Sequence, residues 1–209
     1  MKYSKIPKLM WWLFNKSFKE NLIIYFDYDK KSVNRLSKKA KIRYKEILSA
    51  IPEFEKKDQF IINIVGCAML CSFVLEMDKN VDVDRLTQFY ESAMMTPLMV
   101  KFCKKMSKNK FSKENIAKLK KSSLKRYGDG NPYSWNMEIY EYKDDSGYEA
   151  RFTQCGICTL MNKLGLSHLI PSMCNLDYAM SKAGGNSIFI RKYTIASGGP
   201  YCDCGYKKK

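Results

Sequence analysis

The strongest constraint on the fold is a break in the sequence pattern at Tyr127-Gly-Asp-Gly-Asn-Pro132, because two glycines and a proline end any helix that reaches them. Before this break, apolar residues recur at helical spacing with lysines between them, so residues 1–127 are expected to be almost wholly helical. The patterns predict helices over 32–51, 60–77, 83–106 and 112–124. The helix over 60–77 is apolar nearly all round, which is typical of a central core helix.

After the break, polar and apolar residues alternate, which indicates strands. Residues 135–142 and 148–153 are predicted to form two strands joined by a turn. Short helices are predicted over 155–164 and 173–183, each stopped by glycine, and residues 187–196 are rich in strand-forming types. The predicted fold class is therefore α+β, with a helical part followed by a small antiparallel sheet and two short helices.

The net charge of +16 is unevenly distributed, with +14 on residues 1–130 and +2 on residues 131–209. Residues 101–126 alone hold eleven Lys and Arg against one Glu. Such a surface either binds the phosphates of a nucleic acid or an anionic lipid membrane, or is simply the solvated side of lysine-rich helices. Arginine, which base readout favours, is scarce, and no nucleic-acid-binding motif accompanies the lysines. We therefore expect solvated helices and no nucleic-acid partner.

These two shifts divide the chain into a basic helical part, 1–130, and a cysteine-rich α+β part, 131–209, that carries the site. We expect the two parts to form one compact domain. The N-terminal apolar run is too short for a secretory signal, and the stretch over 60–75 is too short to span a membrane. The chain is accordingly expected to be cytoplasmic, with reduced thiols and no membrane span.

The single histidine excludes an HExxH zinc site and any His-rich metal centre. His168 itself lies between Gly165 and Pro171 and is expected at the surface. Chemistry must therefore come from Cys, Asp and Arg side chains. This makes the eight cysteines the first place to look for a site.

Five cysteines fall within the last 55 residues, whereas Cys67, Cys71 and Cys103 lie in apolar helical patterns and are expected in the core. Cys155-Gly-Ile-Cys158 follows a predicted strand and opens a helix, whose N-terminus lowers a thiol pKa. Three interpretations stay open for the C-terminal group: a catalytic thiol, packing thiols, or a soft-metal site. The candidate metal ligands are Cys155, Cys158, Cys202 and Cys204.

An ordered series of motifs runs through this region. It consists of Phe152-Thr-Gln-Cys-Gly-Ile-Cys158, Leu164-Gly-Leu166, Cys174-Asn-Leu-Asp-Tyr-Ala179 and Arg191-Lys-Tyr-Thr-Ile-Ala-Ser-Gly-Gly-Pro-Tyr-Cys-Asp203. The series resembles the L-2-amino-thiazoline-4-carboxylic acid hydrolase family. The family usually has an aromatic residue after the final Cys-Asp, where this chain has Cys204.

A second, more limited likeness concerns the closing motif Thr194-x-Ala-x-Gly-x-x-x-Cys202, which resembles that of vinyl-4-reductase-type ligand-binding domains. In some of those domains cysteines and a glutamate hold zinc. Here two of the four possible ligand positions are Arg191 and Thr194, and an arginine repels a cation. This favours a pocket that binds an anion.

The hydrolase resemblance implies that the chain opens a small cyclic amidine or thioimidate that carries a carboxylate, hydrolysing a non-peptide C–N bond through a cysteine or an activated water. The implied catalytic residues are Cys155, Cys174, Asp177, Cys202 and Asp203, and the implied substrate-binding residues are Arg191, Thr194, Gly198 and Gly199.

Individual roles follow from the chemistry of these side chains. Cys155 is the expected nucleophile, Arg191 the carboxylate clamp, and Asp177 a base or an orienting group. The Gly198-Gly199 amides are expected to face developing negative charge. Arg191 has a purely structural alternative, in which it pairs with Asp177 or Asp203. The alternative function is a non-enzymatic small-molecule or metal-binding sensor. No cofactor is expected apart from that possible metal, and the sequence leaves the oligomeric state open.

Overall fold

The computed structural model describes residues 1–55 and 58–209 and comprises two compact units. Unit 1 contains residues 1–96 and 157–176, and unit 2 contains residues 97–156 and 177–209. The expected α+β class is confirmed, because helices precede a four-stranded antiparallel sheet. The division at residue 130 stays a prediction.

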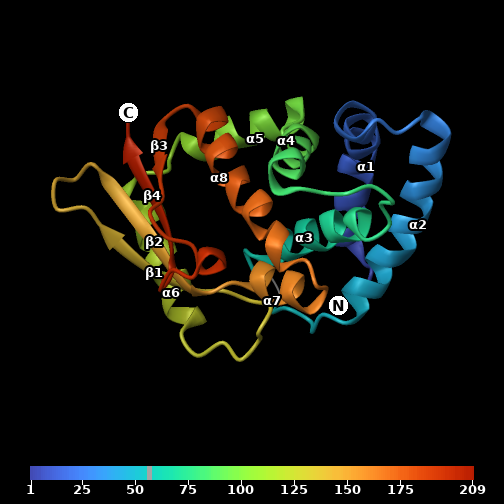
Figure 1. Cartoon of the computed structure of the whole chain (residues 1–209). Helices are drawn as coiled ribbons and strands as arrows, with labels where there is room; N and C mark the ends of the chain where they lie inside the picture. The colour runs from blue at the N-terminus through green and yellow to red at the C-terminus, as the bar shows by residue number, and fades with distance from the viewer. Residues whose placement is uncertain (56–57) are drawn as a thin grey trace. The chain divides into compact units, whose positions relative to one another are not determined.

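Unit 1 is built mainly from α1 (Lys5–Phe26), α2 (Lys30–Ser49), α3 (Ile61–Val74) and α4 (Val83–Met94) (Figure 1). Eleven of the fourteen residues of α3 are buried, and α3 packs against α1 and α2, so it is the predicted central helix. Trp11 of α1 stacks between Tyr44 of α2 and Phe73 of α3, with ring centroids 5.6 and 5.5 Å away. The core of unit 1 is therefore an aromatic and aliphatic helix interface.

Polar caps fix where several helices begin. Asp29 accepts the backbone N–H groups of Lys31 and Ser32 at the start of α2, and Asp82 caps α4 in the same way. In unit 2, Ser112 accepts the N–H of Asn115 and starts α6 (Lys113–Arg126), as the sequence predicts. Each cap satisfies N–H groups that have no partner within the helix.

The single helix predicted over 83–106 is wrong. The helix ends at Met94, and a separate helix, α5 (Pro97–Ser107), begins at Pro97. Proline lacks the N–H that would continue the helical ladder and disfavours helical geometry in the residue before it, but it is well suited to a first helical position. The apolar pattern continues through this break because both helices bury one side.

The sheet of unit 2 has the order β1–β2–β4–β3 and is antiparallel throughout. Its strands are β1 (Asn136–Glu141), β2 (Gly147–Gln154), β3 (Ser187–Ile190) and β4 (Cys202–Lys208). The predicted hairpin of β1 and β2 is confirmed. The strand tendency expected over 187–196 ends at Ile190, and the chain then forms a loop that contains the 3-10 helix η2 (Ile195–Ser197).

The remaining helices are α7 (Gly156–Lys163), η1 (Ser167–Leu169) and α8 (Ile170–Gly184). Both α7 and α8 were expected as short helices. His168 lies in η1 and is exposed, as predicted. No helix in the described part of the chain is both long and apolar enough to cross a lipid bilayer.

Side chains on one face of the sheet form an aromatic layer. Tyr148 of β2 lies opposite Tyr206 of β4, and Tyr206 lies opposite Phe189 of β3. The ring centroids of these neighbours are 5.5 and 5.2 Å apart. Tyr178, in the part of α8 that belongs to unit 2, packs edge-on against Phe189 at 4.7 Å. This layer forms the base on which the candidate site is built.

Candidate functional site

Cys202 and Asp203 are neighbours in the motif series, but strand β4 places their side chains on opposite sides of the sheet. Alternation along a strand puts Cys202, Cys204 and Tyr206 on one face of the sheet and Asp203 on the other. All of Cys202, Asp203 and Cys204 are buried. The two thiols therefore lie on the same side of the sheet as the aromatic layer, and the Asp203 side chain lies on the opposite side.

Asp203 fastens the loop that follows β3. Its two carboxylate oxygens accept the backbone N–H groups of Lys192 at 2.8 Å and Tyr193 at 2.5 Å. These bonds satisfy an otherwise costly buried charge. The structure thus gives Asp203 a role in holding the loop, on the face away from the thiols, and its expected catalytic role stays a prediction.

The loop itself uses most of the other motif residues. Thr194 caps η2 by accepting the N–H of Ser197 at 3.1 Å. Gly198 has a φ of 77°, and its N–H donates to the carbonyl of Ile195, while the N–H of Gly199 donates to that of Thr194. A side chain at Gly199 would lie 2.9 Å from the Thr194 carbonyl oxygen. The Gly198 and Gly199 N–H groups thus close the turn, and their expected role toward developing negative charge stays a prediction.

Arg191 is the buried cation of the site, with a side chain only 8% exposed. Its Nη2 donates to Asp177 Oδ2 at 2.5 Å and to Cys204 Sγ at 2.9 Å, and its Nε donates to the Asp203 carbonyl at 3.3 Å. Its guanidinium also lies 4.7 Å from the centre of the Phe189 ring. The pairing with Asp177 is the structural alternative considered for this arginine. Cys204, where the family has an aromatic residue, is one of its partners.

Asp177 lies on α8, and its side chain is 40% exposed although it forms the ion pair with Arg191. Burial raises the pKa of Asp177, while Arg191 and Lys110 act in the opposite direction. Burial by itself would lower the pKa of Arg191, but Cys204 and Asp177 together raise it above its usual value. The site therefore joins a permanently charged guanidinium to a carboxylate that remains accessible to solvent.

Cys155 lies between the last residue of β2, Gln154, and the first residue of α7, Gly156, as predicted. Its thiol is half-buried and is close enough to Cys202 to affect the pKa of that residue. Burial raises the pKa of Cys202, the N–H of Ile195 at 3.2 Å lowers it, and Cys155 raises it further. Burial likewise raises the pKa of Cys204 to about 12, so that this thiol stays protonated at neutral pH.

We call Cys155, Cys202, Cys204, Asp177 and Arg191 the thiol–arginine cluster. All five belong to unit 2. Two further cysteines of the series belong to unit 1, where Cys158 is buried in α7 and Cys174 is half-buried in α8. Across residues 1–55 and 58–209, no three or more His, Cys, Asp or Glu side chains are arranged so as to hold a metal ion.

Lys110 is a further residue of this site that the sequence did not single out. It lies between α5 and α6, with Nζ 3.7 Å from the centre of the Tyr206 ring and 3.4 Å from Ser187 Oγ. Burial lowers the pKa of Lys110 to about 8, although Cys103 and Asp177 act to raise it. The protein thus holds a lysine with a pKa of about 8 that interacts with Asp177 of the cluster.

Gly156 is required where β2 turns into α7. A Cβ at this position would lie 1.9 Å from the Tyr133 carbonyl oxygen and 3.1 Å from the Trp135 ring. Because the main obstacle is backbone, Gly156→Ala is expected to destabilise the protein by about 3 kcal/mol and to displace Cys155. Denaturant unfolding tests this, with Gly130→Ala as the control, since a Cβ there meets nothing within 4 Å. Equal stability of the two variants would refute the steric argument.

The fold and the cluster define an α+β protein with a histidine-free site of thiols, a buried arginine and a carboxylate. The model of the L-2-amino-thiazoline-4-carboxylic acid hydrolase family matches residues 63–206. This range covers more than half of the 209 residues, and the chain belongs to that family. No curated protein and no solved structure matches the chain. The family membership confirms the resemblance and extends it from the motif series to α3 and α4 of unit 1.

Proposed function

We propose that the protein hydrolyses a small cyclic amidine or thioimidate that carries a carboxylate, opening the ring at the carbon of its C=N bond and breaking a C–N bond. Family membership supports hydrolase chemistry of this type. The observation that carries the proposal further is the thiol–arginine cluster. It brings an anion-binding group, a candidate nucleophile and a candidate base into one unit of the fold.

Arg191 binds the substrate carboxylate in this proposal. A guanidinium matches a carboxylate with two parallel hydrogen bonds, and its burial strengthens the interaction. Asp177 is its carboxylate partner without substrate, so the substrate carboxylate takes the place of Asp177. That exchange frees Asp177 to accept a proton, a role supported by the exposure of its side chain to solvent.

Cys155 attacks the carbon of the C=N bond. The start of α7 favours its thiolate, and Asp177 is the candidate base that removes the thiol proton. The ring nitrogen takes a proton, the C–N bond breaks, and water then displaces the sulfur. The net change is the addition of one water, with Cys155 regenerated. If water attacks directly instead, Asp177 is the base that activates it.

We assign the donation of a proton to the leaving nitrogen to Lys110, whose ammonium group interacts electrostatically with Asp177. This role requires the charged amine, so wild-type activity is expected to fall as the pH rises through about 8. In Lys110→Met, kcat is expected to fall by about a hundredfold and the alkaline fall to disappear. The control Lys108→Met removes an exposed lysine two residues away. An unchanged alkaline limb in Lys110→Met would contradict the assignment.

The same substitution has an opposite effect on stability. Because the pKa of Lys110 is lower in the folded than in the unfolded protein, its charge destabilises the fold below pH 8, and that cost disappears as the pH rises toward 10.5. Lys110→Met is therefore expected to stabilise the protein at pH 7, by about 1–2 kcal/mol once solvent screening is allowed for. A gain in stability that accompanies a loss of activity separates catalysis from folding.

A screen of cyclic amidines and thioimidates, each with and without a carboxylate, tests the proposed reaction. Turnover of the carboxylate-bearing compounds, with products heavier by one water, is the expected result. Tight binding without turnover would instead favour the sensor, the alternative drawn from the likeness to ligand-binding domains. Metal analysis of protein purified without air accompanies the screen, because bound metal without turnover also favours the sensor.

A further inference from the structure

Helix α1 carries large apolar side chains that face solvent. Trp12 is 75% exposed and Leu9 is 53% exposed, and Ile6, Ile23 and Ile24 are also exposed. Ile6, Leu9 and Trp12 are three residues apart, and Ile23 follows Trp12 by eleven residues, which is three helical turns. Leu9, Trp12 and Ile23 therefore lie within about 60° of one another around the helix, with Ile6 and Ile24 at the edge of this face. We call these five side chains the α1 stripe, although Lys16 and Glu20 interrupt it between Trp12 and Ile23.

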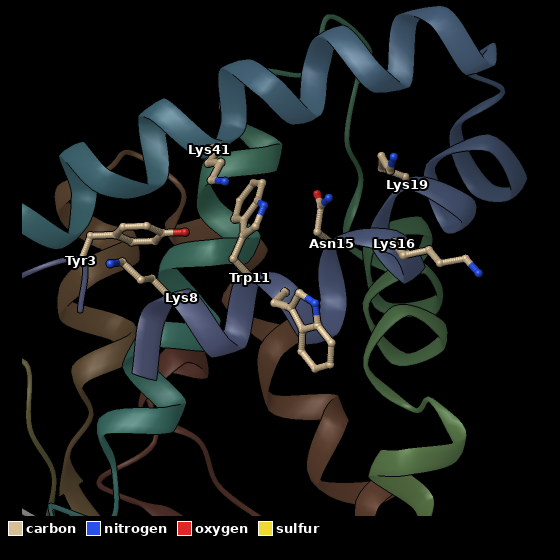
Figure 2. A pocket seen from close by; sticks show the side chains of 8 residues that line it. Tyr3, Lys8, Trp11, Asn15, Lys16, Lys19 and Lys41 are labelled. Atoms are coloured by element: carbon tan, nitrogen blue, oxygen red, sulfur yellow. The ribbon is translucent and has the colours of Figure 1, made fainter. Parts of the chain in front are cut away.

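A hollow of about 620 Å³ lies beside this stripe between α1 and α2 (Figure 2). Four lysines line it, namely Lys8, Lys16, Lys19 and Lys41, together with Trp12 of the stripe. Among the described residues that line the hollow there is no carboxylate. Lys16 also lies 3.8 Å from Glu20, but both of these side chains are largely exposed and the pair adds little. The hollow therefore concentrates positive charge.

We propose that α1 docks on an anionic lipid surface, with lipid phosphates held at the lysine hollow and Trp12 and Leu9 inserted at the level of the headgroups. Helix α1 is itself basic, because it contains four lysines against one glutamate. A tryptophan at the edge of a basic helix is typical of such an interface. The surface lies outside residues 63–206, the range that matches the hydrolase family.

The same observations disfavour the two other occupants. A nucleic acid would use the lysines but would leave the aliphatic side chains Leu9 and Ile23, which lie on the same side of α1 as Trp12, in water. A second copy packed symmetrically through this surface would bring two lysine hollows together, which like-charge repulsion opposes. An anionic lipid surface satisfies both the charged and the apolar features.

Co-sedimentation of the full chain with phosphatidylcholine vesicles, with and without phosphatidylglycerol, tests the proposal. We expect binding only to the anionic vesicles, and a decrease of binding with salt. Lys8→Gln/Lys41→Gln and Trp12→Ser are each expected to weaken binding about tenfold or more. The matched control Lys38→Gln/Lys39→Gln removes the same charge from a neighbouring basic surface of α2. It is expected to weaken binding to the anionic vesicles less than about threefold.

Tryptophan fluorescence gives an independent readout, because Trp11 and Trp135 are 6% and 5% exposed and only Trp12 is open to solvent. A blue shift on anionic vesicles, absent from Trp12→Ser, is the expected result. Several outcomes would overturn the proposal: no binding to anionic vesicles, equal losses in the control, or a monomer–dimer equilibrium abolished by Trp12→Ser. Binding of a single-stranded oligonucleotide that depends on Lys8 and Lys41 but not on Trp12 would also overturn it.

Discussion

Cys155→Ser is expected to lower kcat/KM for ring opening by about a thousandfold or more while the protein remains folded. The hydroxyl of serine is far less acidic than a thiol, so the nucleophile at the start of α7 is lost with almost no change in volume. Steady-state kinetics on the carboxylate-bearing substrate measure the loss, and thermal unfolding verifies the fold.

Cys71→Ala is the control for this substitution, because Cys71 is a buried thiol of unit 1, outside the thiol–arginine cluster and without an interaction with Lys110. It is expected to cost some stability but to leave kcat near that of the wild type. Near-normal turnover by Cys155→Ser would remove Cys155 as the nucleophile and leave the direct attack of water, with Asp177 as its base.

Arg191→Lys is expected to lower kcat/KM by about a hundredfold for a substrate that carries a carboxylate, mainly through a higher KM. Lysine keeps the positive charge but loses the planar group that binds a carboxylate through two hydrogen bonds. The contacts of Arg191 with Cys204 and the Asp203 carbonyl are also lost, so a decrease in stability of about 1–3 kcal/mol is expected.

A substrate analogue without the carboxylate separates binding from a general structural effect. Wild type and Arg191→Lys should turn this analogue over at similar rates, because the analogue offers neither protein a carboxylate to bind. If Arg191→Lys instead lost the same factor with both compounds, its role would be limited to supporting the sheet and the Asp177 carboxylate.

Local sequence rules were sufficient where neighbouring residues decide the structure. The Ser112 cap, the hairpin of β1 and β2, and the position of Cys155 between a strand and a helix all follow from short segments. The boundary at Pro97 also has a local cause, but the regular apolar spacing on both sides of it masked the break. A proline within a helical pattern is therefore stronger evidence than the continuity of that pattern.

The candidate site depended more on tertiary contacts. The Cys202-Asp-Cys204 spacing already contains the alternation that separates Asp203 from the thiols, but only once this segment is known to be a strand. Lys110 lies in a run of similar lysines, and its pairing with the Tyr206 ring is set by residues far away in the sequence. The use of the Gly198 and Gly199 amides within their own turn also required the folded loop.

The central claim is that this member of the family is a working ring-opening hydrolase whose chemistry passes through Cys155. The most direct test is to incubate the purified wild-type chain with L-2-amino-thiazoline-4-carboxylate and to follow the products by mass spectrometry, with Cys155→Ser in parallel. We predict catalytic conversion by the wild type to a ring-opened product heavier by one water, and none above background by the variant. Binding of the compound without conversion by the wild type would contradict the account.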